Sequence, residues 1–585
     1  MKRKMVLGLG GAIIALAAVL SSTALGAGSK PAATVRLHGT VGAADQIGHR
    51  STLFPTSVTK AAHAAGSPRV IPFHSPSGAA FPAKRAHAGP AGPSGPVINT
   101  GGPGTVGRWS GSGFPSLTDL QQSILNTGDP ANFDLTPPDQ GLCAGFLPGG
   151  QEIVLALVNE AAAEYDAHGH LLAQASLASF FLDPYVYSDP RCFYDPATET
   201  FFFTAISFDA TTGYTVDDLG VANIYGFSLY QFDSSMGGVE YGDYPRAGFD
   251  ANAFYISTDQ FAYDYTTGDF GAFNGSELLA IQKSDLVDMV TSPAYKEWDD
   301  ITGPGPDTTS IPTYALQPSF YGLAGDASDT EWLVNSFPYD ASGDPQDFDE
   351  LGLWWVTGDS DVTTASLNGT DISSQTYYFP VPAPSTGNGH VSFVSHCCPL
   401  LTVPVESEQY LNPDDSGLQQ VQMTTSHGDP VLYTTLSSAD PTYSQDVAAW
   451  FVIDPLDQEV TSQGLVQAKG LSILYPAIYH ENGFGFSGGN TDMVFTLTGW
   501  HLNPSVAVFR FDNHMTSGQT AVIVQGNGPH LSFADPVLGE PRWGDYSAAV
   551  LDPGGNGMWM ATEYIGAKHY WAPWDNWGTW VQHVQ

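Results

Sequence analysis

The sequence predicts an all-β protein built as a β-propeller, and three observations support this prediction. Short runs of β-branched and aromatic residues, such as Phe201–Ile206 and Val447–Ile453, are separated by Gly, Pro, Asn and Asp turns. Long patterns with helical periodicity are nearly absent. A cassette of similar residues also recurs along the chain, which is typical of a fold made from repeated units.

Each copy of the cassette contains a polar residue and Pro, a short strand, a turn, and an aromatic strand that ends in small hydroxyl residues. The copies begin at Pro137, Ser188, Gly242, Gln317, Gly428, Tyr475 and Gly544. Radial repetition of four-stranded sheets protects strand edges, so we expect a propeller of seven blades. Six or eight blades, or a large β-sandwich, are the alternatives that the pattern leaves open.

Basic residues are scarce in this chain. Its 585 residues include 19 Lys or Arg and 60 Asp or Glu, which gives a formal net charge of -41. Charged residues make up 14% of the chain, where about 25% is usual. A nucleic-acid-binding function is excluded, because it requires clustered Lys and Arg against the phosphates. The 42% apolar fraction supplies material for a large core.

Residues 1–26 have the three parts of a secretory signal. Met1–Lys4 is basic, Met5–Leu20 is apolar, and Ala24–Gly26 consists of small residues with one Leu. A retained membrane anchor is the alternative. No other stretch approaches the roughly 18 apolar residues that span a bilayer. We therefore expect a secreted protein, extracellular or at the cell surface, without a transmembrane segment once the signal is removed.

Residues 27–115 and 116–585 differ in composition. The first segment is rich in Ala, Gly and Pro and holds eight bases against Asp45 alone, a charge of +7. It predicts a flexible, disordered basic arm that serves as a linker, a removable pro-segment or a cationic strap on the acidic domain. The propeller domain, 116–585, holds 8 bases and 59 acids. So base-poor a domain predicts tolerance of acidic media, in which carboxylates lose their charge.

The cassettes carry a resemblance to known proteins. Ser188–Arg191, Gly242–Arg246 and Arg542–Ser547 resemble the blade starts of secreted bacterial β-propeller proteins, most of them of unknown function and loosely sialidase-like in architecture. The similarity extends over about residues 130 to 570. It implies a propeller and an extracellular setting but no established reaction. The Ser-x-Asp-x-Gly-x-Thr-Trp turns of true sialidases do not occur in the sequence.

Three of the four Arg residues after residue 115 lie at or beside blade starts, namely Arg191, Arg246 and Arg542. A guanidinium fork suits a carboxylate or sulfate, so with Asp189 and Asp243 these residues are candidates for binding an extracellular polymer or cell-surface glycan. Internal ion pairs are the alternative, because Asp189, Asp243 and Asp545 each lie near one of these arginines in sequence.

Carboxylates at the blade starts are candidates for two further kinds of site. A glycosidase requires two carboxylates about 5 to 10 Å apart, and Asp545 with Glu563 is the first pair to test. Several converging carboxylates would suit Ca2+, a cofactor for which the candidate ligands are Asp139, Asp189, Asp243 and Asp545.

The chain has four cysteines, and an even number in an exported protein favours disulfides. Cys143 and Cys192 occupy similar positions in the first two units, so we expect them to pair. Cys397 and Cys398 then form a vicinal pair, or are split between the other two. The aromatic run Tyr570–Trp580 predicts a closing strand, with a sugar-stacking platform as the alternative.

Together these patterns predict an exported, acid-tolerant propeller that acts as an extracellular binding or surface-associated protein. A glycosidase-like hydrolase working at the mouth of the propeller channel is one alternative. An envelope structural component is the other.

Overall fold

The computed structural model describes residues 35–37, 39–55, 95–100, 112–126, 137–182, 186–208, 214–267, 269–385, 410–481, 489–530, 543–566 and 576–585. Among the predicted residues, Arg542, Cys397 and Cys398 lie outside this part of the chain, as do residues 1–26.

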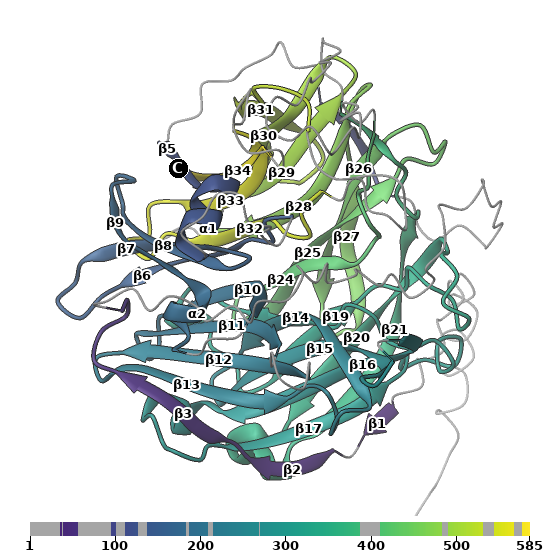
Figure 1. Cartoon of the computed structure of the whole chain (residues 1–585). Coiled ribbons are helices and arrows are strands. Elements are labelled where there is room, and N and C mark those ends of the chain that lie inside the picture. Colours follow the sequence, from purple (N-terminus) through teal and green to yellow (C-terminus); the bar gives the residue numbers. More distant parts are fainter. Residues whose placement is uncertain are drawn as a thin grey trace, which may run out of the picture.

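Antiparallel four-stranded meanders form the body of the molecule (Figure 1). The first three contain β6 (Gly141–Phe146), β7 (Glu152–Val158), β8 (Ala161–Asp166), β9 (Leu171–Ser176); β10 (Val186–Asp195), β11 (Thr200–Phe208), β12 (Thr215–Asn223), β13 (Gly226–Asp233); and β14 (Glu240–Phe249), β15 (Ala253–Asp264), β16 (Asp269–Gln282), β17 (Ala294–Ile301). The cassette at Pro137 lies just before β6, and those at Ser188 and Gly242 lie within the first strands β10 and β14.

The later meanders follow the same plan. They contain β18 (Gln317–Phe320), β19 (Glu331–Asn335), β20 (Phe348–Thr357), β21 (Ser366–Tyr377); β24 (Leu418–Ser426), β25 (Asp429–Ala439), β26 (Asp446–Asp454), β27 (Glu459–Ala468); β28 (Ser472–His480), β29 (Thr491–Gly499), β30 (Leu502–Phe511), β31 (Gly518–Val524); and β32 (Ala548–Leu551), β33 (Met558–Ile565), β34 (Trp577–Val584), β5 (Gly113–Thr118). A parallel pair between β18 and β24 joins two of them into one ten-stranded sheet.

The first strands of the meanders form a closed ring. In sequence order they are β6, β10, β14, β18, β24, β28 and β32; each lies against the next, and β32 lies against β6. The last meander takes its fourth strand, β5, from the N-terminal side of the chain and pairs it with β34. The predicted β-propeller is therefore confirmed.

The Pro of the cassette has a structural reason. In β10, β14 and β28 the register shifts just where the Pro stands, as between Asp243 and Arg246. The residue before each Pro has a positive φ: 53° at Asp189, 59° at Tyr244 and 46° at Tyr475. A β-bulge leaves one residue outside the ladder, and Pro, which has no N–H to donate, fits there without losing a hydrogen bond.

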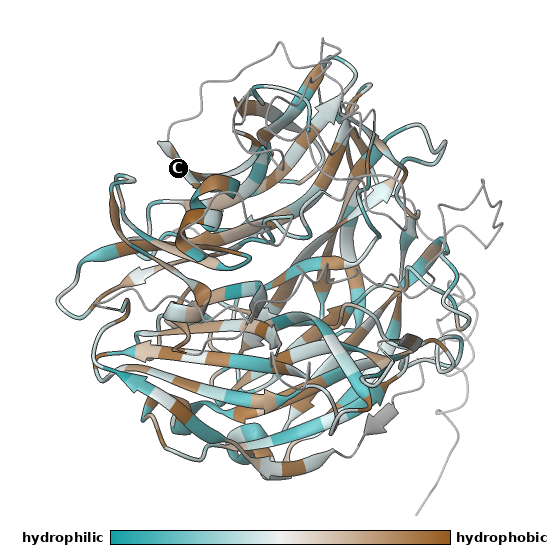
Figure 2. Cartoon of the chain, in the orientation of Figure 1, coloured by the Kyte–Doolittle hydropathy of each residue, from teal (hydrophilic) through white to brown (hydrophobic). Residues whose placement is uncertain are grey.

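The core lies between neighbouring sheets. Phe202 of β11 and Phe254 of β15 stack with ring centroids 4.7 Å apart, which joins the second and third meanders. Middle strands are buried on both faces; in β7, every residue from Ile153 to Val158 is buried. This explains why the apolar runs of the sequence are continuous rather than alternating, and why brown segments crowd these strands in Figure 2.

The predicted pairing of Cys143 and Cys192 is confirmed. Cys143 lies on β6 and Cys192 on β10, the adjacent first strands of two meanders, and their sulfur atoms are bonded. The bond therefore links two sheets that share no backbone hydrogen bonds.

The segment 27–115 departs from the expected flexible arm wherever it is described. It supplies β1 (Val35–Leu37), β2 (Thr40–Ala43), β3 (Asp45–Arg50) and β4 (Val97–Thr100). These pair with the outer strands β21, β17, β13 and β27, so they extend four meanders by one strand each. Figure 1 shows β2 and β3, in purple, along that outer edge. The physical reason is that an outer edge offers unpaired N–H and C=O groups, which a short strand can use without a core of its own.

The remaining elements are short. They are the helices α1 (Asp119–Asn126), α2 (Leu177–Phe180) and α3 (Lys283–Val287), the 3-10 turns η1 (Ala324–Asp326) and η2 (Asp359–Thr364), and the strand pair β22 (Ala383–Pro384) and β23 (Tyr410–Leu411). No helix among the described residues is both long and apolar enough to cross a membrane.

Removal of β5 should open the ring. β5 buries Phe114 and Leu117, so a chain that begins at residue 127 should lose about 3 to 6 kcal/mol of stability relative to one that begins at Ser112. Thermal and urea unfolding, followed by circular dichroism, measure this difference. Equal unfolding midpoints for the two chains would show that β5 does not close the ring.

Candidate functional site

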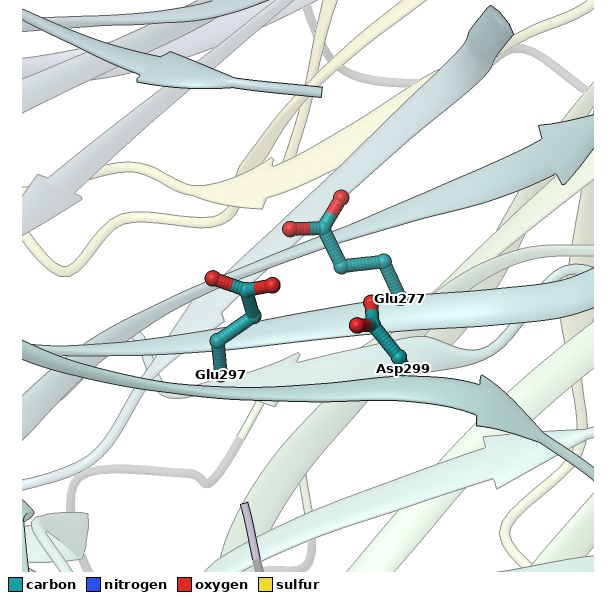
Figure 3. Close-up of side chains that lie close together, drawn as sticks. All are labelled: Glu277, Glu297 and Asp299. Atoms are coloured by element: carbon teal, nitrogen blue, oxygen red, sulfur yellow. The ribbon is translucent and has the colours of Figure 1, made fainter. Parts of the chain in front are cut away.

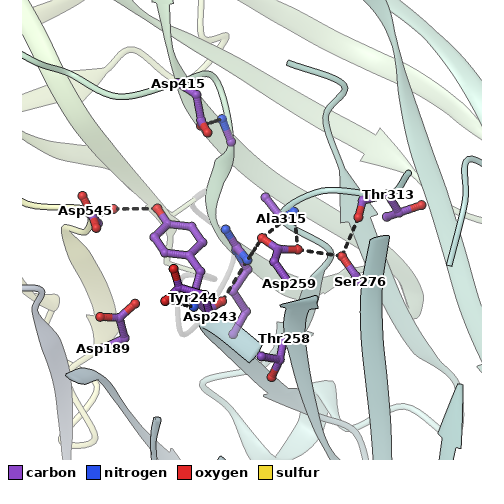
Figure 4. Close-up of polar contacts among 12 residues, drawn as sticks. Asp189, Asp243, Tyr244, Thr258, Asp259, Ser276, Thr313, Ala315, Asp415 and Asp545 are labelled. Carbon is purple, nitrogen blue, oxygen red and sulfur yellow. Dashed lines mark hydrogen bonds and ion pairs between the residues drawn. The ribbon is translucent and has the colours of Figure 1, made fainter. Parts of the chain in front are cut away.

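A buried ion pair lies beside the predicted arginine of β14. Arg246 is fully buried, and its Nη1 donates to Asp259 Oδ2 at 3.0 Å and to the carbonyl oxygen of Tyr244 at 2.9 Å. Asp259 Oδ1 also accepts from Ser276 Oγ at 2.8 Å and from the backbone N–H of Ala315 (Figure 4). Three donors converge on this carboxylate, so we treat the pair as ionised.

Burial and charge act against each other in this pair. Burial would lower the pKa of the Arg246 guanidinium, but the Asp259 charge raises it above its ordinary value. Burial raises the pKa of the Asp259 carboxyl, and the Arg246 charge limits the rise. A buried pair of this kind is costly to break, because either partner alone would be an uncompensated charge.

Tyrosine rings and guanidinium groups form a stack beside this ion pair. The Cζ atom of Arg191 lies 3.4 Å from the ring centroid of Tyr546, and that of Arg246 lies 3.8 Å from the ring centroid of Tyr244. The two rings stack with centroids 4.8 Å apart, and Tyr314 stacks on Tyr244 at 6.4 Å. We call these five residues the axial stack.

The axial stack crosses the centre of the ring. Tyr546 precedes β32, whereas Tyr244 lies on β14, and the first strands β6 and β10 stand between these two along the ring. Tyr244 Oη also donates to the carbonyl oxygen of Asp545 at 3.2 Å. Sheets that are not neighbours can touch in this way only near the propeller axis.

Arg191 differs from Arg246 in forming no ion pair with a described residue. It is 7% exposed, and its Nη2 is buried without a hydrogen-bond acceptor among the described residues. Burial lowers the pKa of Arg191, and the nearby Arg246 charge acts in the same direction. Arg246 likewise has two buried donors, Nε and Nη2, that donate no hydrogen bond in the described part of the chain. Three guanidinium nitrogens of the axial stack therefore donate no hydrogen bond to any described residue.

The predicted aspartates take part in a network around the stack. Tyr546 Oη donates to Asp189 Oδ2 at 3.1 Å, and the backbone N–H of Asp545 donates to Asp139 Oδ1 at 3.0 Å. Asn159 joins the two, because its Nδ2 donates to Asp139 and its Oδ1 accepts from the backbone N–H of Asp189. These bonds link the last meander to the first two.

The expected internal ion pairs are found only in altered form. Arg246 pairs with Asp259 of the next strand instead of Asp243, which accepts from the backbone N–H of Tyr244 at 2.9 Å. The bulge in β14 places Asp243 opposite Asp259 and Arg246 opposite Ser257, so the hairpin brings Asp259 within reach.

No ion pair between Arg191 and Asp189 occurs, and Arg542 lies outside the described residues. Sequence reasoning missed Asp259 as the partner of Arg246. The usable signal was its position directly after the aromatic run Ala253–Thr258 of the cassette.

The two candidate catalytic residues lie close together in the chain's last meander, and both are 2% exposed. A Cβ atom at Gly544 would lie 2.6 Å from Glu563 Oε2, so the Glu563 carboxylate sits against the residue that precedes Asp545. The hydroxyl of Thr496 donates to the backbone carbonyl of Glu563 at 2.7 Å.

A different set of carboxylates forms the group best suited to a metal. Among the described residues, Asp139, Asp189, Asp243 and Asp545 do not form a ligand group, whereas Glu277, Glu297 and Asp299 do. Their carboxylate oxygens lie within 4.8 Å of one another (Figure 3). Sequence reasoning missed these three, because nothing in their spacing distinguishes them among so many acids.

Comparisons with known proteins show only distant likenesses. No family model and no curated protein matches the chain. Extracellular domains 1–2 of Drosophila semaphorin 1b are 9% identical, with a TM-score of 0.32 over 77% of this chain and 86% of that one. An α-L-arabinanase of Cellvibrio cellulosa is 8% identical, with a TM-score of 0.26 over 67% and 96%. A β-fructofuranosidase of Bombyx mori is 10% identical, with a TM-score of 0.25 over 59% and 61%. The family resemblance of the blade starts is thus not confirmed.

Breaking the axial ion pair should destabilise the whole propeller. We expect Asp259→Asn to lower the free energy of unfolding by about 3 to 5 kcal/mol, because it leaves Arg246 charged and buried. Urea unfolding measures the change. Asp492→Asn is the matched control, because Arg510, its partner at 2.6 Å, is 26% exposed and can remain solvated. A loss for Asp259→Asn no larger than for the control would contradict this assignment.

Proposed function

We propose that this protein is an exported, acid-tolerant propeller of seven blades that binds an acidic group of an extracellular polymer or cell-surface glycan at the axial stack. The observation that supports it best is the buried Arg191 guanidinium, which stacks on Tyr546 but forms no ion pair with any residue in the described ranges. Its Nη2, like the Nε and Nη2 of Arg246 in the same stack, donates no hydrogen bond in the described part of the chain. Buried donors without acceptors are costly, so an acceptor from a ligand would find a favourable place there.

The chemistry of the donors favours a carboxylate or sulfate. Guanidinium groups present N–H donors in a planar fork that matches the paired oxygens of these anions. The net charge of the domain opposes an anionic ligand at neutral pH, because residues 116–585 hold only 8 bases against 59 acids. Acidification removes much of this repulsion, while the guanidinium groups stay charged. Binding should therefore be strongest in acid.

Seven blades and export each have their own support. Seven first strands follow one another around the ring, which agrees with the seven cassettes of the sequence. The Cys143–Cys192 disulfide suits an oxidising compartment outside the cytosol, as the signal-like start of the chain does.

Acid tolerance is supported by buried carboxyls that hold protons in the folded state. Tyr255 Oη donates to Asp359 Oδ2 at 2.7 Å, and burial together with Asp359 raises the pKa of Asp250 well above its ordinary value. Burial also raises the pKa of several other carboxyls: to about 8 for Asp446, to about 7 for Asp217, Glu297 and Glu350, and to about 6 for Asp371.

The sign of this effect on stability follows from proton linkage. A carboxyl with a raised pKa binds more protons in the folded chain than in the unfolded chain, whose carboxyls titrate near pH 4. Its contribution to stability is complete below about pH 4 and is lost as the pH rises through its folded pKa. Burial of His480 and His530 acts oppositely, because it lowers their pKa values to about 4 and about 3. Their contribution is complete above about pH 6.5 and is lost as the pH falls toward those values.

The unfolding temperature should accordingly be highest near pH 4 to 5 and fall toward pH 8. Calorimetry from pH 3 to pH 8 measures it. Asp446→Asn should flatten the dependence between pH 5 and 8, since the amide mimics the neutral acid, whereas the exposed control Asp457→Asn should not. An unfolding temperature that is highest at pH 8 would contradict the proposal.

Ligand binding is best tested at pH 4 with three sets of oligosaccharides: uronate-containing, sulfated and neutral. We expect saturable binding of an acidic set, weakened about 10- to 100-fold by Arg191→Gln, which removes a charged hydrogen-bond donor. Arg510→Gln is the matched control, because Arg510 pairs with Asp492 away from the axial stack.

Three results would overturn the binding proposal: equal affinity for neutral sugars, affinity unchanged in Arg191→Gln, or no binding at all. Release of reducing ends is measured in the same samples. Turnover that disappears in Glu563→Gln or Asp545→Asn would assign the protein to the hydrolases instead.

A further inference from the structure

The strongest unassigned feature is a carboxylate cluster between the second and third meanders, away from the axial stack. Glu277 lies on β16, and Glu297 and Asp299 lie on the outer strand β17. We call these three residues the carboxylate triad. Figure 3 shows their carboxylates turned toward one another.

A bulge in the β16–β17 pair produces this convergence. Ser276 pairs with Ile301 and Leu278 with Trp298, so β17 has one extra residue opposite Glu277. Glu297 and Asp299 are two residues apart, so they point to one face of β17, and the bulge re-aims that face toward Glu277. Lys296, which precedes Glu297 in the sequence, is buried, and its Nζ donates to the carbonyl oxygen of Ala365.

Two further buried oxygens, on side chains that neighbour Glu277, accept no hydrogen bond in the described part of the chain. Gln260 is fully buried, and its Nε2 donates to Glu277 Oε2 at 2.7 Å, which holds its own Oε1 beside the triad without a donor. Asp217 of β12 is 1% exposed, and its Oδ2 accepts from Thr258 Oγ1 at 2.7 Å. Thr258 stands directly opposite Glu277 in the sheet, and Asp217 Oδ1 has no donor.

We propose that the carboxylate triad, with Gln260 Oε1 and Asp217 Oδ1, is a Ca2+ site that joins the second and third meanders. All five groups offer oxygen, which selects a hard cation, and Ca2+ accepts six to eight oxygens in flexible geometry. Mg2+ fits less well, because it demands near-ideal octahedral geometry and usually keeps several waters. A cation here would fill buried oxygens for which the described chain supplies no donor.

Charges of one sign meet in this cluster. The carboxylate oxygens of Glu277, Glu297 and Asp299 lie within 4.8 Å of one another. A divalent cation among them would convert mutual repulsion into attraction.

Calcium titration at pH 7.5 tests the proposal, on protein first stripped with chelator. We expect one Ca2+ per chain by isothermal titration calorimetry, at least about tenfold tighter than Mg2+, and a rise in unfolding temperature with Ca2+ concentration. Glu277→Gln should weaken Ca2+ binding at least about tenfold, since it removes a ligand charge.

The Glu277→Gln variant also shows whether weaker Ca2+ binding comes from a missing ligand or from a destabilised fold. Without Ca2+, Glu277→Gln should unfold at the same temperature as the wild type or higher, because the amide relieves repulsion among the acids. Glu350→Gln is the matched control: Glu350 is half-buried beside Asp371 in another meander, and the change should leave Ca2+ affinity intact. No Ca2+ binding, Mg2+ binding of equal affinity, or Ca2+ binding unchanged in Glu277→Gln would overturn the proposal.

Discussion

The axial stack is the interaction on which the arrangement of the sheets depends. Neighbouring first strands are not hydrogen-bonded to each other, apart from the β18–β24 pair in the described chain, so side chains must hold the ring at its centre. Arg191, Tyr546, Tyr244 and Tyr314 come from four different meanders, and the Arg246–Asp259 pair fixes the stack to β15. Guanidinium groups suit this role, because they stack on aromatic faces and bond in their own plane.

The second constraint on the structure is the set of unpaired backbone groups at the outer edge of each sheet. The sequence did not predict which strands pair with these edges. The repeated cassettes predicted the propeller, and the similar positions of Cys143 and Cys192 predicted the disulfide. The strands β1 to β4 gave no signal, because they are short and two of them, β2 and β3, have no buried residue. Their pairing relies on backbone groups that any sequence possesses, so composition alone suggested a flexible segment.

Two arginines of the candidate site could be predicted from the sequence. Because the domain has so few bases, Arg191 and Arg246 could be selected as candidates. Their surroundings could not, because a one-residue bulge decides that Arg246 meets Asp259 and not Asp243. The carboxylate triad shows the converse: acids are so abundant that only the fold reveals which three converge. Spacing along the chain carries no information about partners across a bulge or between meanders.

The scarcity of bases and the burial of carboxyls together determine how the domain neutralises its negative charges. A domain with many acids and few bases can pair only a few of its buried carboxyls, as Arg246 pairs with Asp259, so other buried carboxyls must hold a proton or a cation. The Asp250–Asp359 pair is surrounded by further acids and accepts the hydroxyl of Tyr255, which suits a shared proton. The triad, together with Gln260 and Asp217, instead presents five oxygen-bearing groups, which suits a cation. Protons neutralise the buried carboxyls in acid, and Ca2+ neutralises the triad near neutral pH. The two kinds of cluster therefore let the same fold keep its buried carboxyls neutralised under both conditions.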